Sequence, residues 1–223
     1  MNLDRDMSQP QAGVDFDRFA HTFDTFYDGK RSPVMQWIDR HYRHDVFERY
    51  WQTFERLGDL SGKRGLDVGC GSGLYVAEAV RRGAREVVAL DPALGMLELA
   101  RQRIEKTGRL DRVAFVEGYF PQKTPGGPFD FAIVIGVLDY VAEPVALLKA
   151  LRGILTGRAA VSFPSKHWFR TPIRKFRCRL RNCPVYFYDE RMIRSIGREA
   201  GFGTVDVLKI CGAPMDYHVC LAP

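Results

Sequence analysis

Three glycines at alternate positions mark the stretch of this 223-residue sequence where residue types and spacing best fit a chemical role. The stretch GLDVGCGSGL begins as an apolar strand end, passes through Gly69, Gly71 and Gly73, and continues as a helical pattern from Leu74. Glycine tolerates positive φ angles, and its missing Cβ lets a ligand touch the backbone. A helix that begins in such a turn directs amide N–H groups toward a bound ligand. The pattern predicts a nucleotide-type site at a strand-to-helix turn.

The next predicted strand supplies a carboxylate where a nucleoside would need one. Residues 87–91, VVALD, form a short apolar run that ends in Asp91, 18 residues after Gly73. In a doubly wound sheet, an acidic residue at this place accepts hydrogen bonds from ribose hydroxyls. Two neighbouring strand ends therefore offer a backbone cradle and a ribose acceptor. They do not say which nucleoside cofactor is bound.

The run LDVGCGSG resembles the first motif of class I S-adenosylmethionine-dependent methyltransferases. In that motif an acid, here Asp67, stands two residues before the first glycine, and G-x-G-x-G replaces the dinucleotide-binding G-x-G-x-x-G. The resemblance covers residues 65–144 and implies S-adenosyl-L-methionine as the cofactor. It further implies contacts to the ribose and adenine from Asp91, Pro92 and Met96.

Two later strand ends complete the cofactor site that the resemblance implies. The third predicted strand ends at Gly118, after which the family commonly has an aspartate that binds the adenine amine. This chain has Tyr119 instead, so we expect backbone groups of Tyr119 and Phe120 to meet the purine edge. The fourth strand ends at Gly136, which the resemblance places in the floor between cofactor and substrate.

Strand and helix patterns alternate around these motifs. Periodicity predicts helices at 74–82, 92–107 and 189–200, and strands at 64–68, 86–90, 113–118, 129–136, 159–163, 205–210 and 217–221. The alternation predicts an α/β fold with a Rossmann-like, doubly wound, seven-stranded and mostly parallel sheet. Ligands of such sheets bind at the carboxyl ends of the strands.

Four segments are expected along the chain. They are an N-terminal helical cap (1–60), a cofactor-binding core (61–165), a basic lid insertion (166–188) and a C-terminal completion of the core sheet (189–223). Aromatic residues at helical spacing in the cap favour packing over the sheet. By resemblance, Tyr27 approaches the cofactor and Phe23 lies near the substrate.

The basic lid concentrates positive charge. Seven basic residues and no acidic residue lie between Lys166 and Arg181, although the whole chain carries a net charge of only +6. Three partners stay open: an anionic substrate held by Lys166, Arg170 and Arg174, an anionic membrane surface, or nucleic acid. We favour the anionic small molecule and rank nucleic acid last, since no base-methylation motif such as D/N-P-P-Y is present.

Methyl transfer from a sulfonium is an in-line displacement that depends mainly on positioning and the exclusion of water. A hydroxyl or amine acceptor also needs a base, for which Asp139, Tyr140 and His167 are candidates. Asp139 could equally cap a helical turn, and His167 could be a solvated surface residue. The favoured function is O-methylation of a small, anionic or amphipathic molecule. The alternatives are a non-catalytic partner subunit that binds the cofactor and a nucleic-acid methyltransferase.

The order of a strand, Ser162-Phe163-Pro164, a basic loop and a tyrosine-containing helix start is loosely similar to small-molecule O-methyltransferases. These include enzymes that act on tetrapyrrole carboxylates and quinone precursors, which hints at a substrate class.

Composition predicts a soluble, cytoplasmic protein. The chain is 46% hydrophobic and 27% charged, as in ordinary globular proteins. No apolar run approaches the ~20 residues that span a bilayer, and residues 1–13 lack the apolar core of a signal peptide. The five cysteines form no C-x-x-C pair, so neither a structural metal site nor a disulfide framework is expected.

Overall fold

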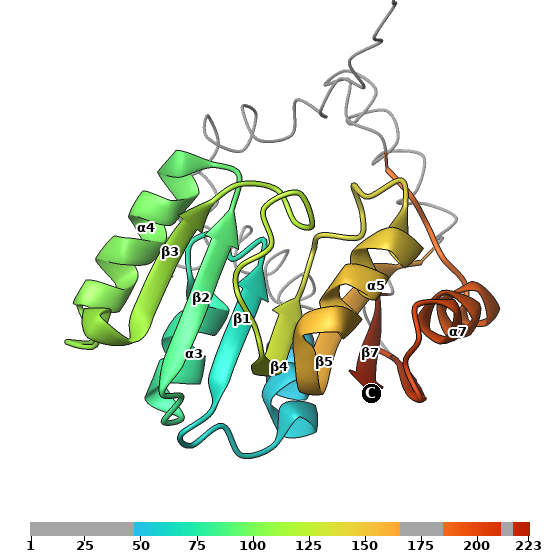
Figure 1. Cartoon of the computed structure of the whole chain (residues 1–223), viewed down its shortest axis with the longest axis horizontal. Coiled ribbons are helices and arrows are strands. Elements are labelled where there is room, and N and C mark those ends of the chain that lie inside the picture. Colours follow the sequence, from blue (N-terminus) through green and yellow to red (C-terminus); the bar gives the residue numbers. More distant parts are fainter. Residues whose placement is uncertain (1–46, 166–184, 211–215) are drawn as a thin grey trace, which may run out of the picture.

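The computed structural model describes residues 47–165, 185–210 and 216–223, which form a twisted sheet with helices on both faces (Figure 1). Within these ranges the sheet has seven strands in the order β3-β2-β1-β4-β5-β7-β6. They are β1 (Arg64–Val68), β2 (Glu86–Asp91), β3 (Val113–Glu117), β4 (Phe129–Val134), β5 (Leu155–Pro164), β6 (Thr204–Lys209) and β7 (Asp216–Ala222). Only β7 runs antiparallel to its neighbours, so the predicted doubly wound, mostly parallel sheet is confirmed.

The helices of the described residues cover the sheet from two sides. They are residues 47–57, α3 (Leu74–Arg81), α4 (Leu94–Glu105), the 3-10 turn η1 (Leu110–Arg112), α5 (Pro144–Ile154) and α7 (Glu190–Glu199). In Figure 1, α5 lies in front of the sheet and α3 behind it.

Side-chain alternation along the strands builds one hydrophobic core on each face. In β4, Ala132 and Val134 belong to the core beneath α5 and α7, whereas Phe131 and Ile133 belong to the core beneath α3, α4 and residues 47–57. Successive side chains of a strand point to opposite faces, so a strand covered on both faces is apolar throughout. This explains why the central strands read as continuous apolar runs.

Several predicted element boundaries differ from the structure by one to four residues, including the following three. α4 begins at Leu94 rather than Pro92, because Ala93 is an extended N-cap whose N–H bonds to the Asp91 side chain. β4 ends at Val134, two residues before Gly136. β5 begins at Leu155, directly after α5, since Gly157 lets the strand approach the carbonyl of Asp130, where a Cβ would collide.

The last part of the predicted cap, residues 47–57, is fixed to the sheet through a buried histidine. His218 of β7 is fully buried, and its Nε2 donates to the hydroxyl of Thr53 (3.1 Å), which itself donates to the Arg49 carbonyl (2.7 Å). Arg56 donates to Nδ1 and to the carbonyl oxygen of His218, at 3.1 and 2.8 Å, and pairs with Asp206 of β6. Burial lowers the pKa of His218 to about 3, with Arg56 and Arg49 adding to the effect.

We expect His218 to make stability fall in mild acid. In the unfolded chain the His218 imidazole is protonated below about pH 6.5, whereas in the folded chain it stays neutral down to about pH 3. Between about pH 7.5 and pH 5, the wild-type protein should therefore lose about 2 kcal/mol more unfolding free energy than His218→Gln, which does not titrate. Urea melts of both proteins at the two pH values measure this difference. Parallel pH dependences would contradict it.

Candidate functional site

The glycine turn between β1 and α3 is held against the end of β2 by its own amides. Gly69 N and Cys70 N both donate to the Leu90 carbonyl, at 2.7 and 3.0 Å, and Gly71 N donates to Asp91 Oδ2 (2.9 Å). These three amides therefore hold the turn in shape. The expectation that the first N–H groups of the helix from Leu74 point at a ligand stays a prediction.

Gly69, Gly71 and Gly73 all have positive φ (70°, 53° and 75°), but their surroundings differ. A Cβ on Gly69 would collide with Val137, and one on Gly73 would collide with Ala100 of α4, so these two allow close packing. A Cβ on Gly71 would meet nothing within 4 Å. The open side of the turn is therefore at Gly71, where a ligand could touch the backbone.

Asp91 ties the ends of three strands together. Its Oδ2 accepts from Gly71 N and its Oδ1 from Ala93 N, both at 2.9 Å, while its carbonyl accepts from Gly118 N (3.1 Å). The side chain is buried. Each carboxylate oxygen can accept a second hydrogen bond, so this arrangement is compatible with the predicted ribose contact.

Asp67 is a second buried carboxylate beside Asp91. The two lie on the same face of neighbouring strands, because Asp67 pairs with Ala89 and Asp91 follows two residues later. Burial, followed by the charge of Asp91, raises the pKa of Asp67 to about 8. Asp67 Oδ2 has no hydrogen-bond partner among the described residues. An unsatisfied buried carboxylate oxygen favours a cationic or N–H-bearing ligand group. This acceptor and the open face of Gly71 fit a cofactor with an ammonium group.

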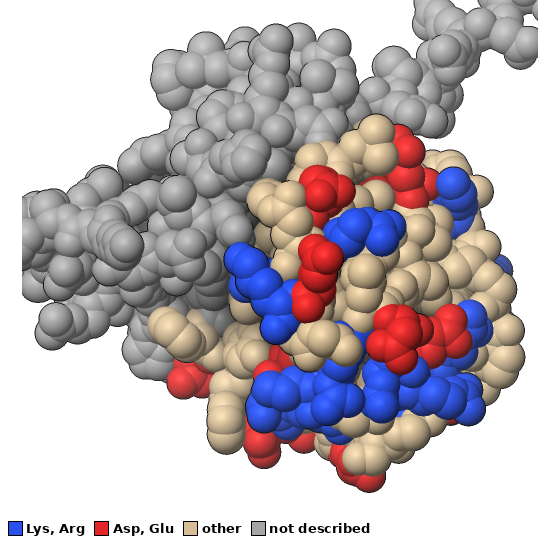
Figure 2. Space-filling model, turned by 90° about the vertical axis from the view of Figure 1, so that its left-hand side faces the viewer, with Lys and Arg blue, Asp and Glu red and all other residues tan. Residues whose placement is uncertain are grey.

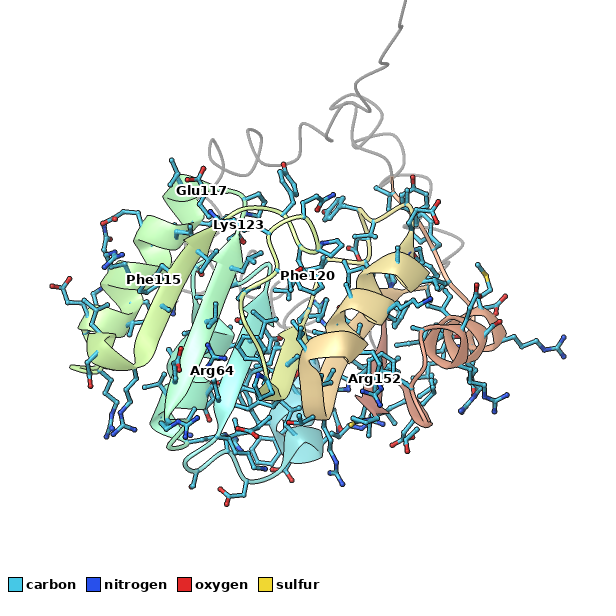
Figure 3. All side chains as sticks on the ribbon, viewed as in Figure 1. Arg64, Phe115, Glu117, Phe120, Lys123 and Arg152 are labelled. Carbon is cyan, nitrogen blue, oxygen red and sulfur yellow. The ribbon has the colours of Figure 1, made fainter. Side chains whose placement is uncertain are left out.

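The residues predicted around the adenine lie at the ends of β2 and β3. Met96 is buried in a small cluster with Ala93, apart from the two main cores, and Pro92 precedes it in the loop before α4. Gly118 has a φ of 150°, and a Cβ there would collide with Lys123. In Figure 3, Lys123 lies near the ends of β2 and β3, whereas Phe120 lies in front of the middle of the sheet, beside α5.

Of the two residues expected to meet the purine edge, Phe120 packs its side chain into the core beneath α5, whereas Tyr119 is partly exposed. Only the backbone of Phe120 is therefore available to a ligand, and its contact with the purine edge stays a prediction.

The loop that follows β4, residues 135–143, carries Gly136 and two of the predicted catalytic residues. A Cβ on Gly136 would meet nothing within 4 Å, so the loop also has an open side. Asp139 is buried in a turn and Tyr140 is partly exposed. Glu143 occupies the N-cap of α5. Both roles considered for Asp139, a base and the cap of a helical turn, stay predictions.

Six predicted site residues fall outside the described part of the chain. They are Phe23, Tyr27, Lys166, His167, Arg170 and Arg174. Their predicted roles remain predictions.

Sequence reasoning missed two residues at the site. The buried hydroxyl of Ser162 in β5 accepts from Gly136 N (2.8 Å), and the hydroxyl of Tyr188 donates to carbonyls of the loop 135–143. A serine within an otherwise apolar strand was the available signal for Ser162, because a buried polar group needs a partner.

Positive charge is not confined to the predicted lid. Figure 2 shows basic side chains gathered in a band across the face that carries α4. Exposed basic residues of α4 and of the turn that follows it are Arg101, Lys106 and Arg109. No helix in the described ranges is long and apolar enough to cross a bilayer.

Residues 42–207 match the family model described as a methyltransferase domain. A ubiquinone biosynthesis O-methyltransferase of Acinetobacter baylyi is 26% identical over 205 residues, covering 85% of this chain and 77% of that protein. An enzyme of the same name from Xanthomonas oryzae is 37% identical over 99 residues, covering 44% of this chain and 40% of that one.

Among solved structures, the magnesium protoporphyrin IX methyltransferase of Synechocystis with bound S-adenosylhomocysteine has a TM-score of 0.68 at 20% identity. The match covers 94% of this chain and 99% of that one. An S-adenosylmethionine-dependent methyltransferase from Mesorhizobium loti has a TM-score of 0.65 at 18% identity, covering 78% and 98%. At these identities the likeness concerns the fold.

Because the family model spans most of the chain, this protein belongs to the methyltransferase domain family. This family membership confirms the prediction of a class I methyltransferase and of S-adenosylmethionine as its cofactor.

The buried carboxyl of Asp67 gives a test of the site's electrostatics. The folded chain keeps this proton to about pH 8, whereas the unfolded chain loses it near pH 3.8, so stability should fall as pH rises through this window. Relative to Asp67→Asn, the wild-type protein should lose on the order of 3 kcal/mol of unfolding free energy between about pH 5 and pH 8. Urea melts measure this, and a constant difference between the proteins would contradict it.

Proposed function

We propose that this protein transfers a methyl group from S-adenosylmethionine to an oxygen of a small, anionic or amphipathic molecule. One observation carries the proposal: at the carboxyl ends of parallel strands, the open turn at Gly71 is bonded to the buried carboxylate of Asp91, and a second buried carboxylate, Asp67, lies on the same face of the neighbouring strand. A nucleoside with a cationic tail suits this arrangement, because it needs both hydroxyl and ammonium partners.

Three groups of this chain would hold the cofactor. Asp91 would accept hydrogen bonds from the ribose hydroxyls while it keeps the glycine turn in shape. Asp67 Oδ2 would accept from the ammonium group, which would favour the ionised carboxylate and offset its desolvation. Gly71 would leave room for the ligand against the backbone.

The sulfonium of S-adenosylmethionine supplies an activated methyl group. The chain's own contribution is to place the acceptor in line with that group and to keep water out. The loop 135–143 brings Asp139 and Tyr140 to the strand ends, where either could remove the proton of an acceptor hydroxyl.

The acceptor is proposed from charge and from the relatives' names. Arginine and lysine side chains of the segment 166–181 would pair with a carboxylate or phosphate of the acceptor. The two named relatives act in ubiquinone biosynthesis and on magnesium protoporphyrin IX, which favours a phenol or carboxyl oxygen as the methyl acceptor.

Two glycine variants test where the cofactor binds. Gly71→Ala should weaken S-adenosylmethionine binding by at least about tenfold, because the new methyl group would occupy the open face of the turn. Gly108→Ala is a matched control, since Gly108 also has positive φ (68°) and open space around it but lies beyond the end of α4. Both variants should lose about 1 kcal/mol of stability. Equal affinities in radiolabelled filter binding would contradict the proposed position.

The reaction is tested by transfer of a tritiated methyl group to a panel of acceptors. We expect label in protocatechuate, a phenol with a carboxylate. Its dimethoxy analogue veratrate keeps only the carboxylate, so label in protocatechuate alone would assign transfer to a phenol oxygen, and label in both to the carboxyl oxygen. Label in RNA would support a nucleic-acid methyltransferase instead. Binding of S-adenosylmethionine without transfer to any acceptor would support a non-catalytic partner subunit.

A further inference from the structure

The loop 135–143 is held in place by two chain segments distant in sequence. On one side, Gly136 N donates to the hydroxyl of Ser162 (2.8 Å), and Ser162 is only 1% exposed. On the other side, Tyr186 N donates to the carbonyl of Asp139 (2.9 Å). The turn itself contributes a bond from Tyr140 N to the Val137 carbonyl (3.0 Å). The backbone around both candidate bases is therefore fixed mainly from outside the loop.

Tyr188 links these two sides. Its N–H donates to the carbonyl of Pro164, at the end of β5, at 2.8 Å. Its ring packs edge-on against Phe163, with ring centroids 5.2 Å apart. Its hydroxyl donates to the Leu138 carbonyl (3.2 Å) and also lies 3.4 Å from the Val141 carbonyl. The phenol thus reaches the carbonyls on both sides of Asp139 and Tyr140.

The ring of Tyr188 contributes packing, whereas its hydroxyl contributes hydrogen bonds to the loop 135–143. The ring is buried among apolar side chains, and a phenylalanine ring would fill the same volume. The hydroxyl satisfies loop carbonyls that lie outside any helix or strand, and a buried carbonyl without a donor is unfavourable. Burial, with the charge of Asp139 adding to it, raises the pKa of Tyr188 to about 12, so the phenol stays a donor at neutral pH.

We propose that Tyr188 is a positioning residue whose hydroxyl holds the loop 135–143 in the shape that presents Asp139 and Tyr140 to the methyl acceptor. The inference rests on the proposed function for its catalytic consequence, but not for the structural one. A loop fixed in this way need not rearrange during the reaction, and small displacements of reacting groups lower rates severely.

Tyr188→Phe is the variant that removes only the hydroxyl. Tyr217→Phe is its matched control, because it removes a phenol hydroxyl from a partly buried tyrosine of β7 that packs against the same core. Ser162→Ala removes the acceptor of Gly136 N and provides a second, independent loss of support for the loop. Three measurements apply to each variant: amide hydrogen exchange by mass spectrometry, calorimetric affinity for S-adenosylhomocysteine, and kcat and KM with protocatechuate.

We expect exchange in a peptide covering residues 136–143 to be about five- to tenfold faster in Tyr188→Phe and Ser162→Ala. Exchange in β1 and β2 and affinity for S-adenosylhomocysteine should be unchanged, and kcat should fall about tenfold with little change in the KM for S-adenosylmethionine. Tyr217→Phe should behave as the wild-type protein. This combination separates positioning from a general loss of stability, which would accelerate exchange throughout the sheet.

Three results would overturn the inference: unchanged exchange in the loop, faster exchange everywhere, or a faster-exchanging loop with an unaltered kcat. If the wild-type protein failed to bind S-adenosylhomocysteine, the proposed function would fail instead. The exchange of the loop in Tyr188→Phe would then still decide whether the hydroxyl holds it.

Discussion

The carboxylate of Asp91 is the constraint on which the site depends. It accepts the amide of Gly71 on one side and that of Ala93 on the other, while its carbonyl accepts from Gly118. Three loops from three strands are thereby set relative to one residue, two of them through its side chain. Because the side chain is buried, these charge-assisted hydrogen bonds act where water competes little. The shape of the glycine turn is thus a property of two strands rather than of a local motif.

The carboxyl group of Asp67 lies beside that of Asp91, and two negative charges there would repel each other. Asp67 is buried near Asp91, and its pKa rises because burial and the neighbouring charge both oppose ionisation. A protein that kept this residue only for packing would gain from an apolar replacement. A ligand with a positively charged group would stabilise the ionised form of Asp67, which explains why a carboxylate occupies this position. The binding of S-adenosylmethionine and the protonation of Asp67 should therefore be coupled.

Local patterns were sufficient to predict most of the fold. The alternating glycines and the apolar strand runs specified the elements. The helix predicted at 189–200 is present as α7, with a cap bond from Met192 N to Asp189. The features that could not be predicted are contacts between residues distant in sequence, because these depend on which strands are neighbours in the sheet. The contacts of Ser162 and Tyr188 with the loop 135–143 join residues 26 to 50 positions apart, and the start of α4 depends on where the Asp91 side chain turns.

The most direct test of the account is a calorimetric titration with S-adenosylhomocysteine of the wild-type protein and Asp91→Ala. We expect micromolar binding to the wild type and a loss of about a hundredfold or more in the variant, because the substitution removes the ribose acceptor and releases the glycine turn. Circular dichroism should show the sheet intact in both. Equal affinities would contradict the role given to Asp91, and no binding to the wild-type protein would contradict the cofactor site itself.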